Sequence, residues 1–368
     1  MDFMIQKSEL LRELQYVQGG VERKSTVPIL SNLLLETTGN TLVVTATDLD
    51  VTVQCVCPAS VKGSGSAAVS ARKLFDIARF LPDAEIHFKS DGQNWIHLTC
   101  ERSKFKIASL PKDNFPALPS VEGRRLLLPP QPLSHMSSRC AFAITQEESR
   151  YTLSGALMIL NPTGITLVST DGHRLVYISH NVEIAGLDQE ERILIPKKTL
   201  TELTKLTGEQ TVAVEFGSSE NHLLFQLGDR LLISRRLAGQ FPNFNMVIPR
   251  ENDKKALLNT VELTNALKRV SVMADDESHS VRLSVKKDQL DIHSSGAEIG
   301  EAKETVSAKY DAEPLEIGFN AQYLLDFLSG LDSDEVEINL RDGETQGLLK
   351  PVAEEGYDHQ YVLMPMKL

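Results

Sequence analysis

The feature that most constrains this 368-residue chain is an internal repeat. The segment at 30–35 (LSNLLL) is echoed at 153–158 (LSGALM), and a Thr-Asp pair follows seventeen residues after each leading Leu. Farther along, an offset of 126 residues joins 69–74 (VSARKL) to 195–200 (IPKKTL) and one Phe-Pro pair to another. Because this register is preserved over about 90 residues, we interpret the two stretches as copies of one module.

A third copy is weaker but falls where it is expected. The segment 319–324 (FNAQYL) fits 69–74 at an offset of 250, and 281–285 (VRLSV) lies where the strand at 30–35 would recur. We therefore predict three domains, at 1–122, 128–250 and 254–368. Pro129-Pro130 and the polar run 250–255 are the expected linkers.

Each repeat combines helical and strand patterns. Leu10, Leu14 and Val17 form the apolar stripe of an amphipathic helix, and second helices are expected at 72–81, 197–206 and 321–328. About eight strands surround them in each copy. This is an α+β fold class, with two helices packed on antiparallel sheets in each of three similar domains. Joining the domains edge to edge would bury their edge strands, and closing the row into a ring would remove the last open edges.

The charge distribution bears on nucleic acid as a partner. A net charge of −12 argues, taken alone, against binding DNA. The six helical segments nevertheless sum to +5, so the remainder carries −17. If all six helices line one surface, that surface is positive on an acidic protein, as suits a channel that holds phosphates loosely. The alternative is that solvated helix exteriors simply tolerate Lys and Arg.

Basic side chains on these helices and before the strands at 30–35 and 153–158 are the candidate DNA contacts. They would bind backbone phosphates, which carry no sequence information. The candidates are Lys24, Arg72, Lys73, Arg79, Arg139, Arg150, Tyr151, Lys197 and Lys198.

Several classes of function find little support. No run approaches the roughly 20 apolar residues of a membrane span, and no signal peptide is recognisable, so we expect a cytoplasmic protein. Walker A, Rossmann and His-Glu-x-x-His motifs are absent, and 63–66 (GSGS) is expected to be a hairpin loop. Cys55 and Cys57 share one face of a strand and are expected to be buried rather than to bind metal. We predict no catalytic residue, no metal site and no cofactor.

Five segments are specific enough to indicate a family: 28–35 (PILSNLLL), 170–175 (TDGHRL), 239–244 (GQFPNF), 317–320 (IGFN) and 361–368 (YVLMPMKL). Spread in order over nearly the whole chain, they resemble the beta sliding clamp of bacterial DNA polymerase III. The resemblance implies a head-to-tail homodimer that forms a six-domain ring, with helices inside and sheets outside. Such a ring encircles double-stranded DNA without sequence preference and makes the replicative polymerase processive, without being an enzyme itself.

The resemblance also implies a pocket between the second and third domains. It would accept short apolar peptides from the replicative polymerase, the clamp loader and repair proteins. Met246 stands where family members often have Arg, and Glu344 where a small apolar residue is common. The implied pocket residues are Leu153, Thr170, Gly172, His173, Arg174, Leu175, Pro242, Met246, Val247, Asn320, Tyr323, Val362, Leu363, Met364, Pro365 and Met366.

The subunit contact implied by the resemblance is apolar at its centre. Phe105 and Ile107 of one subunit would meet Val272 and Met273 of the other. Charged side chains would flank them, namely Lys73 and Arg102 facing Glu298, Glu301 and Glu304.

Two other classes of function stay open. Asp171 and His173 could form the acid–base pair of an enzyme that acts on nucleotides, although fixing a turn is the simpler role for them. Asp275, Asp276 and Glu277 could bind a metal, although such acidic runs are usually solvated loops. A repeat scaffold that binds peptides but not DNA is the second alternative.

Overall fold

The computed structural model describes residues 1–22, 27–145, 147–208, 211–296 and 300–367, so Lys24 and Glu298 lie outside the described residues. The chain divides into two compact units. One contains residues 1–134 and 198–236, and the other contains residues 135–197 and 237–368. The second of the three predicted repeats therefore contributes to both units.

The first unit is built on a 13-stranded antiparallel sheet. Its strand order is β10-β15-β16-β17-β4-β3-β2-β6-β9-β8-β7-β1-β5. The strands are β1 (Asp2–Gln6), β2 (Asn32–Thr38), β3 (Thr41–Thr47), β4 (Val51–Pro58), β5 (Ser60–Gly63), β6 (Gly65–Ser70), β7 (Glu85–Ser90), β8 (Trp95–Cys100), β9 (Ser103–Leu110), β10 (Arg125–Leu128), β15 (Val214–Ser218), β16 (His222–Leu227) and β17 (Arg230–Arg235).

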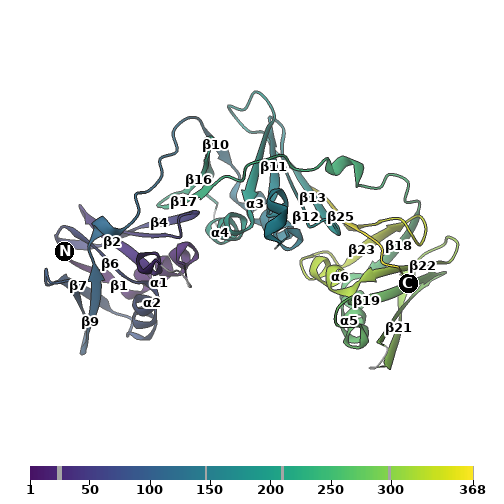
Figure 1. Cartoon of the computed structure of the whole chain (residues 1–368), viewed down its shortest axis with the longest axis horizontal. Coiled ribbons are helices and arrows are strands. Elements are labelled where there is room, and N and C mark those ends of the chain that lie inside the picture. Colours follow the sequence, from purple (N-terminus) through teal and green to yellow (C-terminus); the bar gives the residue numbers. More distant parts are fainter. Residues whose placement is uncertain (23–26, 146, 209–210, 297–299, 368) are drawn as a thin grey trace. The chain divides into compact units, whose positions relative to one another are not determined.

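Three helices lie side by side in this unit. Helix α1 (Lys7–Val17) packs on β3 and β4, and α2 (Ala71–Phe80) packs beside it on β2 and β6 (Figure 1). Gln15 and Gln18, at the end of α1, line a cavity together with Lys198 and Glu202 of α4 (Lys197–Thr207). The apolar stripe Leu10, Leu14 and Val17 is fully buried, as the sequence predicts.

The second unit is built on a 12-stranded antiparallel sheet. Its order is β14-β11-β12-β13-β25-β24-β23-β18-β21-β20-β19-β22. The strands are β11 (Gly155–Asn161), β12 (Gly164–Thr170), β13 (Arg174–Asn181), β14 (Glu191–Pro196), β18 (Lys254–Asn259), β19 (Ser280–Lys286), β20 (Gln289–Gly296), β21 (Gly300–Lys309), β22 (Leu315–Asn320), β23 (Glu335–Leu340), β24 (Gly347–Pro351) and β25 (Tyr357–Leu363).

Helices recur in the second unit in the same manner. Helix α5 (Thr260–Val270) packs beside α6 (Ala321–Leu328), as Figure 1 shows. The C-terminal part of α3 (Pro130–Cys140) reaches the loop after α6, where Arg139 Nη2 lies 2.6 Å from Asp332 Oδ2. Side-chain caps fix where helices begin in both units. Ser70, Asn259 and Asn320 each accept a hydrogen bond from a backbone N–H three residues on, and such caps stabilise a helix by about 1 kcal/mol.

Most predicted elements agree with the structure, with two corrections at the connections. The linkers are shorter than predicted, because Pro130 already belongs to α3 and Lys254 opens β18. The stretch 63–66 is not a hairpin loop. Strand β5 pairs with β1 whereas β6 pairs with β2, so the two neighbouring strands diverge at Ser64.

Candidate functional sites

The C-terminal tail bridges two predicted repeats. Strand β25 pairs with β13 of the second repeat over seven residues, from Tyr357 to Leu363. Beyond it, Met364 N donates to His173 O at 2.9 Å, and Met366 N donates to Gly318 O of β22 at 2.8 Å. The tail of the third repeat is therefore hydrogen-bonded to the second repeat as far as Met364, and Met366 bonds back to a strand of the third repeat.

A tight turn between β12 and β13 presents the segment that the tail meets. Asp171 Oδ1 accepts hydrogen bonds from the backbone N–H groups of His173 (2.9 Å) and Arg174 (3.0 Å). Gly172 has a φ of +93°, a conformation that side chains disfavour. Asp171 and His173 thus fix the turn rather than act as an acid–base pair, and the exposed His173 stands at its tip.

Arg174 is the cation that the carboxylates of this region surround. Its Nε lies 2.9 Å from Asp171 Oδ2, and its Nη1 lies 2.6 Å from Asp326 Oδ2 of α6. Its guanidinium also covers the ring of Tyr323 at 4.2 Å and donates to the carbonyl oxygen of Phe142 at 2.9 Å. Arg174 is only 9% exposed and bonds residues of both the second and the third repeat. We call this set of contacts a tie between the two repeats.

An apolar floor lies beside this tie. Leu175 and Val362 are buried in one cluster with Phe244, and Val247 packs against it while remaining half-buried. Met364 and Met366 are half-buried as well. The predicted pocket residues in this region thus split into a closed floor and an accessible rim.

The remaining predicted pocket residues have mixed placements. Leu153 and Thr170 are half-buried, and Thr170 Oγ1 donates to Arg174 O at 2.6 Å. Asn320 is occupied as the cap of α6 and by a bond from its Nδ2 to Ser278 O (3.1 Å). Pro242 is exposed, and Met246 is 81% exposed. These placements leave Met246 free to contact another molecule.

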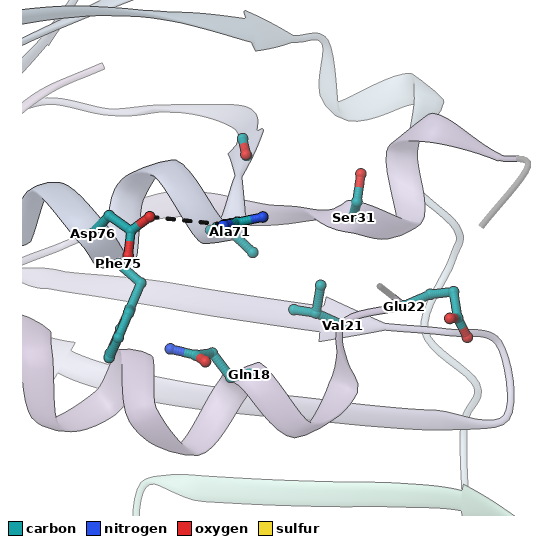
Figure 2. Close-up of a pocket in the computed structure, with 9 residues that line it drawn as sticks. Gln18, Val21, Glu22, Ser31, Ala71, Phe75 and Asp76 are labelled. Atoms are coloured by element: carbon teal, nitrogen blue, oxygen red, sulfur yellow. Dashed lines mark ion pairs between the residues drawn. The ribbon is translucent and has the colours of Figure 1, made fainter. Parts of the chain in front are cut away.

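The basic side chains of α2 are accessible. Arg72 has 91% of its side chain exposed and lies 3.9 Å from Asp76, and Lys73 and Arg79 are also exposed. Figure 2 shows that α2 begins at a cavity, which the segment that follows α1 also lines through Gln18 and Val21. The volume of this cavity is about 490 Å³. The N-terminal end of a helix attracts anions, but the carboxylates of Glu22 and Asp76 line the same cavity beside Arg72.

Other predicted DNA contacts are engaged within the chain. Arg139 has 11% of its side chain exposed and is paired with Asp332, which does not fit a phosphate contact and corrects that prediction. Lys198 is ion-paired with Asp48, and Arg150 Nη1 donates to Asp171 O at 2.8 Å. Burial and the nearby Arg174 lower the pKa of Lys197. Tyr151 remains 54% exposed.

Two strands have open edges. Strand β9 pairs with β8 along 103–108, but it pairs with β6 only at Ser109 and Leu110. Strand β21 pairs with β20 along its length, but it pairs with β18 only at Ala308 and Lys309. Within the part of the chain that the structure describes, residues 103–108 and 300–307 therefore each have one edge without a strand partner. Phe105 is 38% exposed on the first edge, and Glu301 is exposed on the second.

The described residues offer little for catalysis. No group of three His, Cys, Asp or Glu side chains among them is placed to bind a metal. All four cysteines are buried, as predicted for Cys55 and Cys57, and burial raises the pKa of Cys57 and Cys140 to about 12. Thiols of this kind are unreactive near neutral pH. No helix in the described part has the length and apolar character needed to cross a bilayer.

Comparisons with known proteins cover the whole chain. Residues 1–119, 127–243 and 245–367 match the N-terminal, central and C-terminal domains of the DNA polymerase III beta subunit. The chain belongs to this family. The beta sliding clamp of Pseudomonas putida is 35% identical, and that of Chlamydia muridarum is 31% identical over 100% of this chain and 99% of the relative. The P. putida alignment covers both proteins fully.

Solved structures of the family agree with this fold. The Bartonella birtlesii sliding clamp bound to griselimycin superposes with a TM-score of 0.93 at 34% identity, and the Pseudomonas aeruginosa beta subunit with 0.90 at 32%. Each match covers 100% of both chains. Membership confirms the clamp fold and the function predicted from the resemblance. The chain is the non-catalytic processivity subunit of a DNA polymerase III holoenzyme.

One contact of this clamp chain was not predicted from the sequence. Glu13 of α1 is 4% exposed and accepts from Arg230 Nε (2.9 Å) and Nη2 (2.8 Å). Arg230 also covers the ring of Tyr16 at 3.6 Å. The only available signal was the position of Glu13 beside the buried stripe of α1, which places its side chain at the border of the core.

Proposed function

We propose that two copies of this chain close head to tail into a ring around duplex DNA, with domains at 1–122, 128–250 and 254–368. The observation that carries the proposal is the pair of open strand edges, one in the first repeat and one in the third. An open edge invites pairing with another strand. Because the two edges differ in sequence and position, pairing them joins different ends of two copies, as a closed head-to-tail ring requires.

The two edges are complementary in charge. Residues 102–106 carry Arg102, Lys104 and Lys106, whereas the edge of β21 carries Glu301 and Glu304 beside one Lys303, and Glu304 is also ion-paired with Arg269 of its own chain. Phe105 and the half-buried Ile107 supply apolar area on one side, and Val272, which is 72% exposed, and Met273 supply it on the other. Apolar residues flanked by opposite charges are the composition expected of a subunit interface.

The contact is tested by placing a charge in its apolar centre. We expect Met273→Asp to yield monomers in sedimentation, because an unpaired carboxylate would be buried on association. Asp276→Asn, in the exposed loop that follows, is the control and should sediment as the wild type does. A Met273→Asp protein that remains dimeric would reject this assignment.

Duplex DNA would pass along the helices of the ring. The exposed Arg72, Lys73 and Arg79 on α2 are the best-placed contacts to phosphates, and the exposed Tyr151 adds a further contact. Their number is small, which suits sliding better than tight binding. Each phosphate contact adds to the salt dependence of the affinity, so replacing Arg72 and Lys73 by Gln should reduce that dependence by roughly two released ions.

Partner proteins would bind the rim formed by the tail and the turn at 170–174. Half-buried Met364 and Met366 lie over a closed floor that includes Leu175, and flexible methionine side chains adapt to varied apolar ligands. The peptide partners are those of the replicative polymerase, the clamp loader and repair proteins. We place the ring in the cytoplasm with them.

Calorimetry with a polymerase-derived peptide tests the pocket. Met364→Ala combined with Met366→Ala should weaken binding about tenfold or more, as truncating apolar anchors does, while the dimer stays intact. Met4→Ala, a half-buried methionine on β1 of the first unit, should leave the affinity unchanged. If the double variant and the wild type bind the peptide with equal affinity, the peptide does not bind at Met364 and Met366.

A further inference from the structure

A cluster of charged and titratable side chains lies at the far end of the β13–β25 pair from the tail. Glu354 is its centre, with Oε1 2.6 Å from His135 Nε2 and Oε2 2.9 Å from His359 Nδ1. An ionised carboxylate only accepts, so both imidazoles donate. Arg139 Nε lies 3.5 Å from Glu354 Oε1, and its Nη2 bonds Asp332. His135 and Arg139 belong to the second repeat and the other members to the third.

Tyr357 adds an aromatic contact to the same cluster. Its ring lies between the rings of His135 (4.3 Å) and His180 of β13 (4.7 Å). His180 Nδ1 lies 2.8 Å from Gly356 O. The loop between β24 and β25 is therefore held from both sides by the second repeat. We call Glu354, His135, His359 and Tyr357 the Glu354 clasp.

Two side chains of the clasp, those of Glu354 and His359, are largely buried and therefore depend on hydrogen-bond partners within the protein. The side chains of Glu354 and His359 are 14% and 1% exposed. Burial alone would raise the pKa of Glu354, but the bonds from His135 and His359 outweigh it and hold that pKa well below its usual range. His359 Nε2 is buried and has no hydrogen-bond partner among the described residues, so a proton there would be an unpaired buried donor. Among the described residues, the hydrogen bond of the His359 side chain is therefore the one between its Nδ1 and Glu354.

The clasp lies where β25 has least support from its own repeat. Strand β24 pairs with β25 only at Tyr361, Val362 and Leu363. Residues 357–360 therefore have β13 as their one strand partner in the described structure. A contact that fixes residues 357–360 against β13 therefore also fixes the register of residues 361–363, which lead into the tail.

A row of contacts runs from the clasp to the rim of the proposed pocket. The ring of His359 meets Phe327 edge-on at 5.3 Å, and Phe327 stacks on Tyr361 at 4.6 Å. Tyr361 Oη donates to Tyr323 O at 2.9 Å, and Tyr323 lies under the guanidinium of Arg174. The clasp and the rim are thus joined by the strand and by packed side chains.

We propose that the Glu354 clasp positions the tail for partner peptides, by fixing β25 against β13 at the end remote from the pocket. Its members are positioning residues and do not touch the peptide. The inference rests on the proposed function of the pocket. It adds that affinity for partners depends on a contact at the opposite end of the strand from the peptide.

Glu354→Gln in the full-length dimer tests the proposal. Glu355→Gln is the matched control, because the next residue is an exposed glutamate and the charge change is the same. Hydrogen exchange should accelerate across 357–363 in Glu354→Gln but not in the control. A polymerase-derived peptide should bind about three- to tenfold more weakly, the range expected for coupling through a packed network. Wild-type exchange rates in Glu354→Gln would overturn the proposal.

A second pair of variants separates positioning from general destabilisation. His135→Gln keeps a side-chain N–H near Glu354, whereas His135→Leu removes it. We expect His135→Gln to restore most of the exchange protection and peptide affinity that His135→Leu loses. Equal loss in both variants would contradict the clasp. If the wild type binds no peptide, the proposed pocket fails, and the exchange rates still decide whether the clasp fixes β25.

Discussion

The junction between the first and second repeats and the junction between the second and third use the same kind of tie. At each one, a strand of the second repeat pairs with a strand of its neighbour: β17 with β4, and β13 with β25. At each one, an arginine with little of its side chain exposed bonds a helix carboxylate and covers the ring of a tyrosine three residues from that carboxylate. Arg230 does so with Glu13, and Arg174 with Asp326.

The surroundings of the two ties differ. The cavity at the first tie is lined largely by charged and polar residues, among them Glu9, Arg12 and Asp229. The second tie lies beside the apolar floor and carries the half-buried methionines of the tail. Joining two repeats therefore does not by itself create a partner site. We propose that the added apolar tail creates one, because it leaves surface that another apolar segment can cover.

The largest effect is expected at the first tie. Glu13→Ala leaves the guanidinium of Arg230 buried without its carboxylate and should lower the free energy of unfolding by about 3 kcal/mol. Urea denaturation measures this change, and Glu122→Ala, which replaces an exposed glutamate of the same unit, is the control. Peptide affinity should be unchanged. A loss of peptide binding in Glu13→Ala would remove the distinction between the two junctions.

A smaller loss of stability but a larger loss of binding is expected at the second tie. Asp326→Ala leaves Arg174 paired with Asp171, so the free energy of unfolding should fall by only about 1–2 kcal/mol. Peptide affinity should fall about tenfold, because Arg174, which covers the ring of Tyr323, loses its carboxylate partner on α6. Asp311→Ala, an exposed aspartate of the same repeat, is the control in calorimetry. An unchanged peptide affinity of Asp326→Ala would mean that partner peptides do not bind at this rim.

The smallest effect is an acid dependence shared by both junctions. Burial would raise the pKa of Glu13 and of Glu354, but their hydrogen-bond partners lower both. Their contribution to stability is then complete above the unfolded-state pKa of about 4.3 and is lost as the pH falls below it. Glu13→Gln and Glu354→Gln should each lose less stability than the wild type below that pH. Parallel urea-unfolding profiles for wild type and variants would contradict this.

The sequence was sufficient for the repeats and for most helices. Local signals fix these features: the stripe Leu10, Leu14 and Val17 gives the buried face of α1, and caps such as Ser70 and Asn320 give helix starts. Contacts between remote segments leave no such local signal. Glu13 meets Arg230 and His135 meets Glu354 across more than 200 residues, so neither pairing could be predicted.

The sequence identified candidate site residues but did not show which of them are buried or engaged by other residues. Arg139 has the same pattern as a solvated helix cation, and only its partners Asp332 and Glu354 reveal that it is engaged. The tail is apolar throughout, and its sequence does not distinguish the buried Val362 and Leu363 from the accessible Met364 and Met366. The resemblance to sliding clamps supplied the pocket residues, and the pairing of β25 with β13 supplied their division into floor and rim.

The most direct test of the account is whether topology retains the protein on DNA. The chain should be loaded by its clamp loader onto nicked circular DNA and then followed by gel filtration before and after the circle is linearised. We expect the protein to stay on the circle and to slide off the linear ends, with little change on adding moderate salt. Equal retention on circular and linear DNA would mean that affinity rather than encirclement holds it, which would contradict the ring.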